Sequence, residues 1–431
     1  MTVLSQARRM AHATPDSRNR YVDFLRAISI IAVVVGHWLI AAPHVADGEI
    51  HGINLLAHSP WTQWLTWAFQ VMPVFFMVGG YSNATSWAAS RRHGDTYGTW
   101  LTARLRRLLL PVAPLVAVWT VLGVVLSAAN VDAALLKLGS QSAIIPLWFL
   151  AVYVMMVALT PALEMLWDRF GWGSIAGLAA AAAVVDLTIA AVDWIGWLNF
   201  GFVWAAVTQI GTAWHRGRIG GRRSLPLVLG SSTLLLLVVA LGWYPISMVG
   251  VPGAIATNNS PPTLALLLYG LAQTSVLLLI EQPARRWLSR VGIWTGTVLV
   301  NGLIMTLYLW HLTAMVLLIG GSLLIGGFGF GLEPGSGVWW LTRPVWLGTA
   351  ALATIPFLAL FRRFDSIARL RDGVRVGAAP AVGVAVASCL GLALLAGVGI
   401  GGPVLGIDGV AVALVLGAVA AVRRMGATRP A

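Results

Sequence analysis

The sequence predicts an all-α polytopic membrane protein with about twelve transmembrane helices. Of its 431 residues, 58% are hydrophobic and only 10% are charged, whereas soluble domains carry roughly 25% charged residues. The apolar residues form runs of about 20, the length that spans a bilayer core. Because these runs recur from residue 24 to residue 422, a soluble fold is excluded and no sizeable aqueous domain is expected.

Twelve apolar segments follow one another along the chain, and each would cross the hydrocarbon core as a helix. The first ten would form a core domain. The last two, over residues 378–400 and 407–422, consist almost wholly of Ala, Val, Gly and Leu, so we treat them as an appended pair. The segment centres lie near Ala32, Met72, Ala117, Met155, Ala181, Trp204, Leu236, Ala272, Met305, Thr349, Val386 and Val415.

The positions of the basic residues predict the orientation. The net charge is +13, and the arginines stand in short blocks between the apolar segments. With the N-terminus inside, all 28 Lys and Arg residues except Arg26, Lys137 and Arg343 fall in inner segments, as the positive-inside rule requires. Both termini are therefore predicted to be cytoplasmic, in a cell inner (plasma) membrane. The expected parts are a cytoplasmic segment (1–20), a transmembrane domain (21–361), a basic cytoplasmic loop (362–376), and two additional helices with a cytoplasmic tail (377–431).

Composition also excludes several classes of function. In a soluble protein the basic balance would suggest nucleic acid, but here membrane orientation accounts for it, so no nucleic-acid partner is expected. The single cysteine, Cys389, excludes an internal disulfide, a thiolate zinc cluster and an iron–sulfur centre. We expect no metal. The pair Arg8–Arg9 is followed by a polar stretch rather than the apolar one of a secretory signal, so the first helix is predicted to be retained.

Two predicted outside loops differ in character from the basic inner ones. Residues 43–60 carry His44, Asp47, Glu49, His51 and His58, and residues 244–262 are rich in Pro, Gly and Asn. Both are typical of turns and short re-entrant pieces.

Ionisable residues inside a spanning segment are costly and mark candidate functional sites. In the first helix, Arg26 lies at the inner boundary, three residues after Asp23, and His37 follows eleven residues later. Eleven residues are about three helical turns and about 16 Å of rise, so both side chains lie on nearly the same face. One ligand would reach both. The alternative is that Arg26 only anchors the helix at the interface and His37 is a hydrogen-bonded packing residue.

Five segments together resemble the membrane-bound acyltransferase family often called acyltransferase-3. Arg26 and His37 lie in RYVDFLRAISIIAVVVGHW, which resembles the family's first-helix signature. The other segments are VFFMVGGYS (74–82), RLRRLLLP (104–111), PLWFLAVY (146–153) and LYLWHL (307–312), which resemble its later motifs in the same order. The resemblance covers roughly residues 21–361, about ten helices. The Glu-containing tail that often follows the fourth motif is missing, and the last two helices exceed the family's usual core.

The resemblance implies transfer of an acyl group, usually acetyl from cytoplasmic acetyl-CoA, to a hydroxyl of a sugar or lipid-linked glycan. The expected partners are an acyl-CoA donor, a cell-envelope glycan or glycolipid acceptor, and the lipid bilayer. Coenzyme A is a polyanion, and the predicted inner loop from Arg91 to Arg107 supplies arginines suited to bidentate phosphate contacts. We expect Arg104, Arg107 and Arg26 to bind the donor.

His37 and His311 are the candidate catalytic residues. A neutral imidazole at His37 would take the proton of the acceptor hydroxyl as that hydroxyl attacks the thioester. His311, ten residues after Asn301, would orient the acceptor or hold an oxyanion. Counted from an inner boundary near Ile293, it lies roughly 27 Å into the membrane. A kink at Gly302, or an acceptor bound near the outer side, would reconcile this depth with that of His37.

Polar and aromatic groups of the motifs are the candidate substrate-binding residues. Tyr81, Ser82 and Asn83 are expected to close the second helix, where they would cap it or line the cavity, and capping is the better interpretation of Asn83. Trp148 and Tyr153 come from the fourth motif. Asp186 is a further buried acid, for which a satisfied structural role is favoured over a proton relay.

A twelve-helix transporter or flippase is the alternative function. The second inner loop lacks the Gly-x-x-x-Asp-Arg-x-Gly-Arg pattern of the major facilitator family, no long central loop divides the helices, and no internal repeat is visible. A purely structural scaffold leaves Arg26 and His37 unexplained. The acyltransferase interpretation is therefore favoured.

Overall fold

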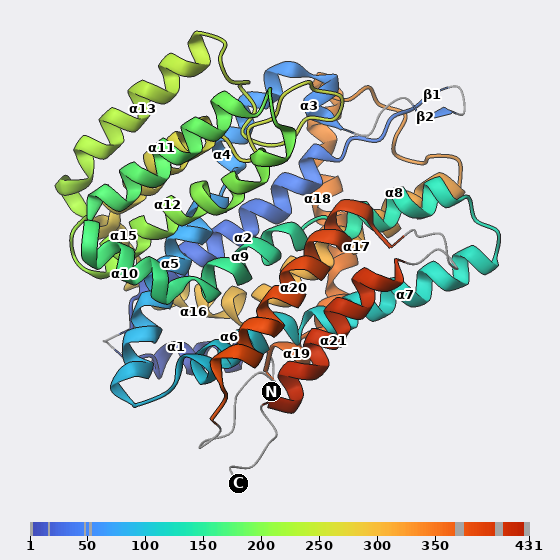
Figure 1. Ribbon diagram of the computed structural model, residues 1–431. Coiled ribbons are helices and arrows are strands. Elements are labelled where there is room, and N and C mark those ends of the chain that lie inside the picture. The colour runs from blue at the N-terminus through green and yellow to red at the C-terminus, as the bar shows by residue number, and fades with distance from the viewer. Residues whose placement is uncertain are drawn as a thin grey trace.

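The computed structural model is a bundle of α-helices (Figure 1). It describes residues 3–15, 18–46, 49–50, 54–366, 375–400 and 408–425. Within these residues the only strands are β1 (Val45–Ala46) and β2 (Glu49–Ile50), which form one short antiparallel pair. The all-α prediction is therefore confirmed. Asp47 and His51 of the first predicted outside loop, most of the predicted basic loop, and Arg429 in the tail lie outside the described residues.

Five helices are long and apolar enough to cross a membrane singly. In the described part of the chain the number rises to nine if each of four bent helix pairs is one span. The protein is thus a multi-pass membrane protein, whereas the count of twelve spans and the cytoplasmic side of both termini stay predictions. The five single spans are α2 (Arg20–Ile40), Gly221–Ala240 with α13 (Leu225–Ala240), α17 (Ile304–Leu324), α18 (Gly337–Phe361) and α20 (Ala378–Val398).

At three of the four bent pairs, a proline or a glycine stands at the break between the two helices. Pro111 and Pro146 stand at two of the breaks, where the ring removes a donor and crowds the preceding turn. Gly171, with a φ of 51°, ends α10 and allows a 113° bend. The pairs are α6 (Tyr97–Leu109) with α7 (Val112–Ala128), α8 (Ala133–Ile144) with α9 (Leu147–Ala158), α10 (Thr160–Phe170) with α11 (Trp172–Thr188), and α14 (Leu264–Leu279) with α15 (Glu281–Leu288).

All twelve predicted centres lie on helices. Met72 and Met305 lie in the first turns of α5 and α17, so these helices run further along the chain than expected. The remaining helices are α1 (Val3–His12), α3 (Leu55–His58), α4 (Thr66–Phe69), α5 (Met72–Arg92), α12 (Asn199–His215), α16 (Val291–Gly302), α19 (Arg363–Ser366) and α21 (Gly409–Met425), with 3-10 turns at Pro60–Leu65, Asp193–Leu198 and Gly221–Ser224.

Glycines allow α5 and α12 to approach each other closely. A Cβ added to Gly80 would lie 2.1 Å from the Thr208 carbonyl oxygen, and one added to Gly211 would lie 2.0 Å from that of Met77. Such small residues let transmembrane backbones pack at short range. The glycines of VFFMVGGYS therefore set the position of α5 beside the rest of the bundle.

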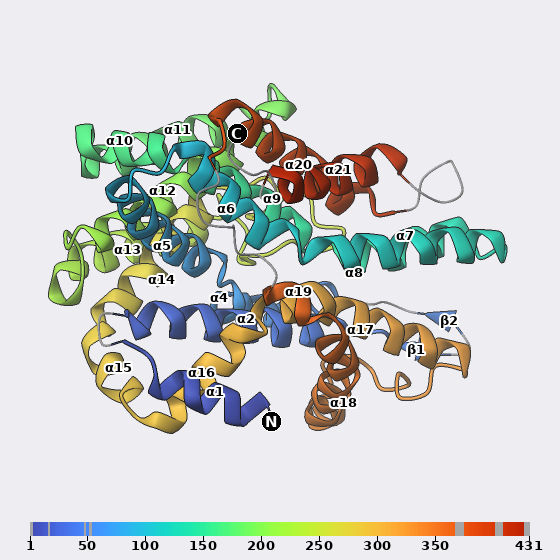
Figure 2. The ribbon, with the colours of Figure 1, turned by 90° about the horizontal axis from the view of Figure 1, so that it is seen from below.

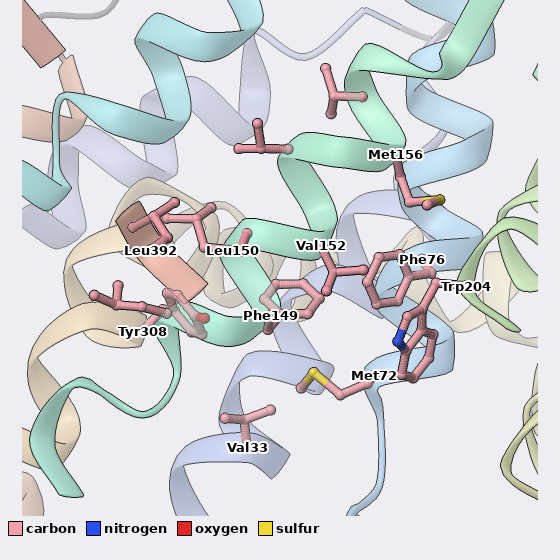
Figure 3. Packing of buried hydrophobic residues seen from close by; sticks show 14 of the residues in the cluster. Val33, Met72, Phe76, Phe149, Leu150, Val152, Met156, Trp204, Tyr308 and Leu392 are labelled. Atoms are coloured by element: carbon pink, nitrogen blue, oxygen red, sulfur yellow. The ribbon is translucent and has the colours of Figure 1, made fainter. Parts of the chain in front are cut away.

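Aromatic and aliphatic side chains fill the centre of the bundle (Figure 3). Phe76 of α5 stacks on Trp204 of α12 at 4.4 Å between ring centroids. Phe149 of α9 meets the edge of Phe76, and Val33 of α2 belongs to the same buried cluster. Leu392 of α20 lies beside this core in Figure 3, so the last two helices share it.

The C-terminal helices pack on α6 and α9 rather than standing apart (Figure 2). At one end of α20, Thr96 donates to the Val376 carbonyl (3.0 Å) and the Val376 amide donates to Thr99 Oγ1 (3.0 Å). Farther along, the Cys389 thiol donates to the Ala151 carbonyl at 3.2 Å. The buried Arg106 on α6 donates to the carbonyl of Val422 in the last turn of α21 (3.1 Å). The appended pair is thus an integral part of the bundle.

Replacing Arg106 with alanine should destabilise the folded protein. The last carbonyls of a helix lack intrahelical donors, and a cation there also meets the negative end of the helix dipole. Losing such charge-assisted bonds should cost about 1.5–3 kcal/mol. Thermal unfolding of the detergent-solubilised protein measures this, with the exposed Arg92→Ala as control. Equal melting of the two variants would contradict a capping role for Arg106.

Candidate active site

His37 and His311 meet at the centre of the site. His37 Nδ1 lies 3.0 Å from His311 Nε2, and the rings stack with centroids 5.2 Å apart. The two residues are 274 positions apart in the sequence. His311 is fully buried, whereas His37 keeps part of its surface accessible. The structure therefore brings the two candidate catalytic residues into direct contact.

A break in the late helix explains how His311 reaches the depth of His37. The helix is interrupted at Leu303, immediately after Gly302, so that α16 and α17 are separate helices that both pack on α2. Asn301 fixes the end of α16 by donating to the Asp23 carbonyl (2.8 Å) and to that of Thr297 (2.9 Å). This break next to Gly302 agrees with the first of the two arrangements that the sequence analysis offered.

The hydrogen-bond network determines which nitrogens carry protons in the neutral pair. His311 Nδ1 faces two carbonyl oxygens, those of Tyr308 (2.8 Å) and Leu307 (3.2 Å). Carbonyls only accept, so His311 Nδ1 must carry the hydrogen and His311 Nε2 must be the acceptor. His37 Nδ1 then donates to it. His37 Nε2 is left with a free lone pair, the form a general base requires.

Two tryptophans hold the pair in place. The Trp38 indole donates to the His311 carbonyl at 3.2 Å. The Trp346 indole of α18 donates in turn to the Trp38 carbonyl at 2.7 Å. Because Trp38 follows His37 directly, α2, α17 and α18 are tied together at the level of the histidines.

Arg26 lies toward the other end of α2. Its Nη2 donates to Ser82 Oγ on α5 at 3.0 Å, and its Nη1 lies 3.8 Å from Asp23 Oδ1. Asp23 Oδ2 also accepts from Arg18 Nε at 2.5 Å. With 32% of its side chain exposed, the Arg26 guanidinium is held in place but remains accessible to an anion.

Arg104 and Arg107 lie on helix α6 and not, as predicted, in a loop. Only a few residues separate α5 from α6, and α6 is amphipathic. Its arginines therefore form the polar face of a helix rather than part of a loop. Arg104 is half-buried and close enough to Arg26, Arg107 and Tyr153 for electrostatic interaction. Arg107 is exposed. The three predicted donor-binding arginines thus form one basic cluster on one side of the histidines.

The sequence profile of a family described as an acyltransferase domain matches residues 19–363. That match covers the arginine cluster, the histidine pair and all five motifs. The chain belongs to the acyltransferase-3 family. It is therefore a membrane acyltransferase. No curated protein and no solved structure shows significant similarity to it.

The predicted substrate-binding residues of this acyltransferase lie on α5 and α9. Helix α5 continues to Arg92 because Tyr81 packs on Trp214 (4.5 Å between centroids) and Ser82 binds Arg26. Tyr81 and Asn83 therefore do not close the helix, and the capping interpretation of Asn83 is wrong. Asn83 is buried, and its Nδ2 has no hydrogen-bond partner among the described residues.

Tyr153 and Trp148 stand at different levels of α9. Tyr153 lies against Gly79, where a Cβ would come within 2.7 Å of the ring, and close to Arg104. Trp148 packs on Phe200 and Trp204, with centroids 6.2 and 6.3 Å away. Only Tyr153 thus joins the arginine cluster of the acyltransferase.

Asp186 has a structural role, as the sequence analysis favoured. One carboxylate oxygen accepts from Asn199 Nδ2 (2.8 Å), and the other accepts from the Tyr244 hydroxyl (2.8 Å) and the Leu264 amide (2.7 Å). This aspartate is therefore fully satisfied. A cavity of about 360 Å³ between α13 and α14, next to Trp67, contains none of the predicted site residues.

Sequence reasoning missed two contacts of this acyltransferase site. It named Ser82, which ends VFFMVGGYS, as a polar group of the second helix but did not predict its bond to Arg26. Trp346 carries no sequence signal that links it to α2, since its bond to the Trp38 carbonyl depends on tertiary packing alone.

Proposed function

We propose that this acyltransferase moves an acetyl group from acyl-CoA to a hydroxyl of a cell-envelope glycan or glycolipid, with His37 as general base. The observation that carries the proposal is the 3.0 Å contact between His37 and the buried His311. It leaves the lone pair of His37 Nε2 free to accept a proton. Both nitrogens of His311 are occupied, so this residue positions His37 instead of contacting the acceptor or an oxyanion.

The reaction needs two proton transfers and the exchange of a carbon–sulfur bond for a carbon–oxygen bond. His37 Nε2 takes the proton of the acceptor hydroxyl while the oxygen attacks the thioester carbonyl. The new carbon–oxygen bond forms, the carbon–sulfur bond breaks, and the proton passes from the imidazolium to the departing thiolate. The products are the O-acetylated acceptor and free coenzyme A, and His37 returns to its neutral form.

The arginine cluster supplies the donor side of this proposal. Arg26, Arg104 and Arg107 gather on one side of the histidines, and planar guanidinium groups suit the phosphates of coenzyme A. Arg26 and His37 are separated by eleven residues of the continuous helix α2, about 16 Å of rise. An extended pantetheine arm suits such a separation. In the predicted orientation, the donor enters from the cytoplasm.

Replacing Arg104 or Arg107 with alanine should raise the KM for acetyl-CoA more strongly than it lowers kcat. Phosphate contacts are made equally in the ground state and the transition state, so their loss weakens binding first. Initial rates of acetyl transfer from radiolabelled acetyl-CoA by the purified protein test the effect, with the exposed Arg92→Ala as matched control. Unchanged kinetics in both variants would mean that these arginines do not bind the donor.

A further inference from the structure

Arg343 is a cation on the inward face of a helix that otherwise faces outward. The buried residues of α18 are Trp339, Arg343, Ala350 and Thr354. They follow one another at intervals of one or two helical turns, so they lie on one face of the helix. Residues on the other faces of α18 are exposed, for example Leu341, at 80%. Arg343 itself is only 7% exposed. It therefore points toward the bundle, so it is not a residue that simply anchors α18 in lipid headgroups.

The contacts of Arg343 leave its charge without an anion. Its Nε donates to the Trp339 carbonyl and its Nη2 to Thr342 Oγ1, both at 3.3 Å, and its guanidinium carbon lies 3.9 Å from the centre of the Trp339 ring. No carboxylate in the described part of the chain lies within ion-pair distance. A guanidinium has five N–H donors, and these bonds use two of them. An inward-facing charge without a counter-ion inside a membrane protein marks a functional site by default.

Arg343 stands on the opposite side of the histidines from Arg26. Its guanidinium lies 5.9 Å from the centre of the Trp346 ring, and Trp346 binds the carbonyl of Trp38, the residue after His37. Arg26 and Trp38 are twelve residues apart on α2, about 18 Å along the helix. Figure 1 shows the start of α18 at the end of the bundle that carries α3, with α6 toward the other end. The hydrogen bond from Ser59 to the Pro334 carbonyl agrees with this placement.

We propose that Arg343 is an anion subsite for the acceptor, which therefore carries a phosphate or a carboxylate group. This inference rests on the proposed function. The phosphates of the donor are assigned to the cluster at the other end of α2, so the anion at Arg343 belongs to the second substrate. The free donors of the guanidinium form the fork that binds oxyanions in a bidentate manner. Trp339 and Trp346 hold the guanidinium through cation–π contacts.

Three alkyl sugars that differ only in the group at carbon 6, which is neutral in one and anionic in two, test the subsite. We would measure binding of octyl β-glucoside, octyl β-glucuronide and octyl β-glucoside 6-phosphate to the full chain in nanodiscs, without acetyl-CoA. The wild-type protein should bind one of the anionic probes roughly tenfold or more tightly than the neutral one. The stronger anionic probe identifies the source as a sugar acid or a phosphorylated glycan. Arg343→Gln should remove the preference, and Arg343→Lys should keep part of it. Lys137→Gln, which removes the other predicted outside cation, should leave it unchanged.

Two results would overturn the subsite: equal binding of all three probes by the wild-type protein, or an undiminished preference in Arg343→Gln. Equal binding by the wild-type protein overturns the subsite even where Arg343→Gln fails to fold, and the Arg343→Lys protein then serves as the variant. Because binding is measured without donor, the test is separate from acyl transfer. A charge preference that depends on Arg343 in a protein that transfers no acetyl group would support the subsite and contradict the proposed function. Acetyl transfer by a protein that shows no such charge preference would support the proposed function and contradict the subsite.

Discussion

Replacing His37 with alanine is expected to lower acyl transfer by roughly 10²–10⁴-fold, the usual worth of a positioned general base. The protein should stay folded and still bind coenzyme A, because the arginine cluster around Arg26 lies about three helical turns away. Equilibrium binding of radiolabelled acetyl-CoA and initial transfer rates separate the two effects. Binding should survive while the rate falls.

The opposite interpretation of His37 predicts a different pattern. If His37 only packs against His311, the alanine variant would lose the 3.0 Å contact and would unfold at lower temperature. Its transfer rate per folded molecule would then stay close to that of the wild-type protein. Thermal unfolding measured beside the rates distinguishes the two cases.

Replacing His311 with leucine is the second change with a large expected effect. His37 would lose the acceptor that orients its ring and holds the hydrogen on Nδ1. Small displacements of a catalytic group cost about 10²-fold, so kcat should fall by roughly that factor. The KM for acetyl-CoA should stay unchanged, since His311 touches only His37 and backbone carbonyls among its hydrogen-bond partners in the described residues.

A conservative variant separates positioning from bulk stability at His311. His311→Gln offers a carbonyl oxygen that still accepts from His37 Nδ1, so it should recover part of the lost kcat. His93→Leu, at an exposed histidine that follows α5, is the control for general loss of a histidine. If leucine and glutamine at residue 311 gave the same kcat as the wild-type protein, the positioning role would be contradicted.

The local part of the site was predictable from the sequence. Helix α2 forms as expected because an apolar run follows the N-cap Asn19, whose side chain accepts from the Tyr21 amide. Within one regular helix, the spacing of Arg26 and His37 determines their separation and their shared face. The helix break next to Gly302 was one of two arrangements that the sequence allowed, since glycine is a poor helix former.

The long-range part was not predictable from local pattern. The contact between His37 and His311 depends on how α17 packs against α2, and no periodicity within either helix encodes it. Helix α5 passes through its polar residues because a partner such as Arg26 satisfies Ser82 from another helix. The polar residues at positions 81–83 and the family motif led the sequence analysis to expect a helix end there.

The C-terminal helices show the same limit of sequence analysis. Their small apolar side chains carry no chemical signal, so they were treated as an appended pair. In the structure, their contacts to α6 and α9 use backbone carbonyls, such as those of Val376 and Val422, and close apolar packing. Every residue type has the same backbone carbonyl, so the sequence does not reveal which carbonyls accept hydrogen bonds from other helices.

Transfer by a His37→Gln protein is the most direct test of the central claim, that His37 is the general base. Glutamine keeps hydrogen-bonding capacity close to that of a neutral imidazole, but it cannot take up a proton at neutral pH. We would saturate the folded variant with radiolabelled acetyl-CoA in proteoliposomes containing envelope glycolipid and follow acetyl transfer to the lipid fraction. The account predicts normal donor binding and a rate lowered by at least about 10²-fold. Transfer near the wild-type rate by the folded variant would contradict it.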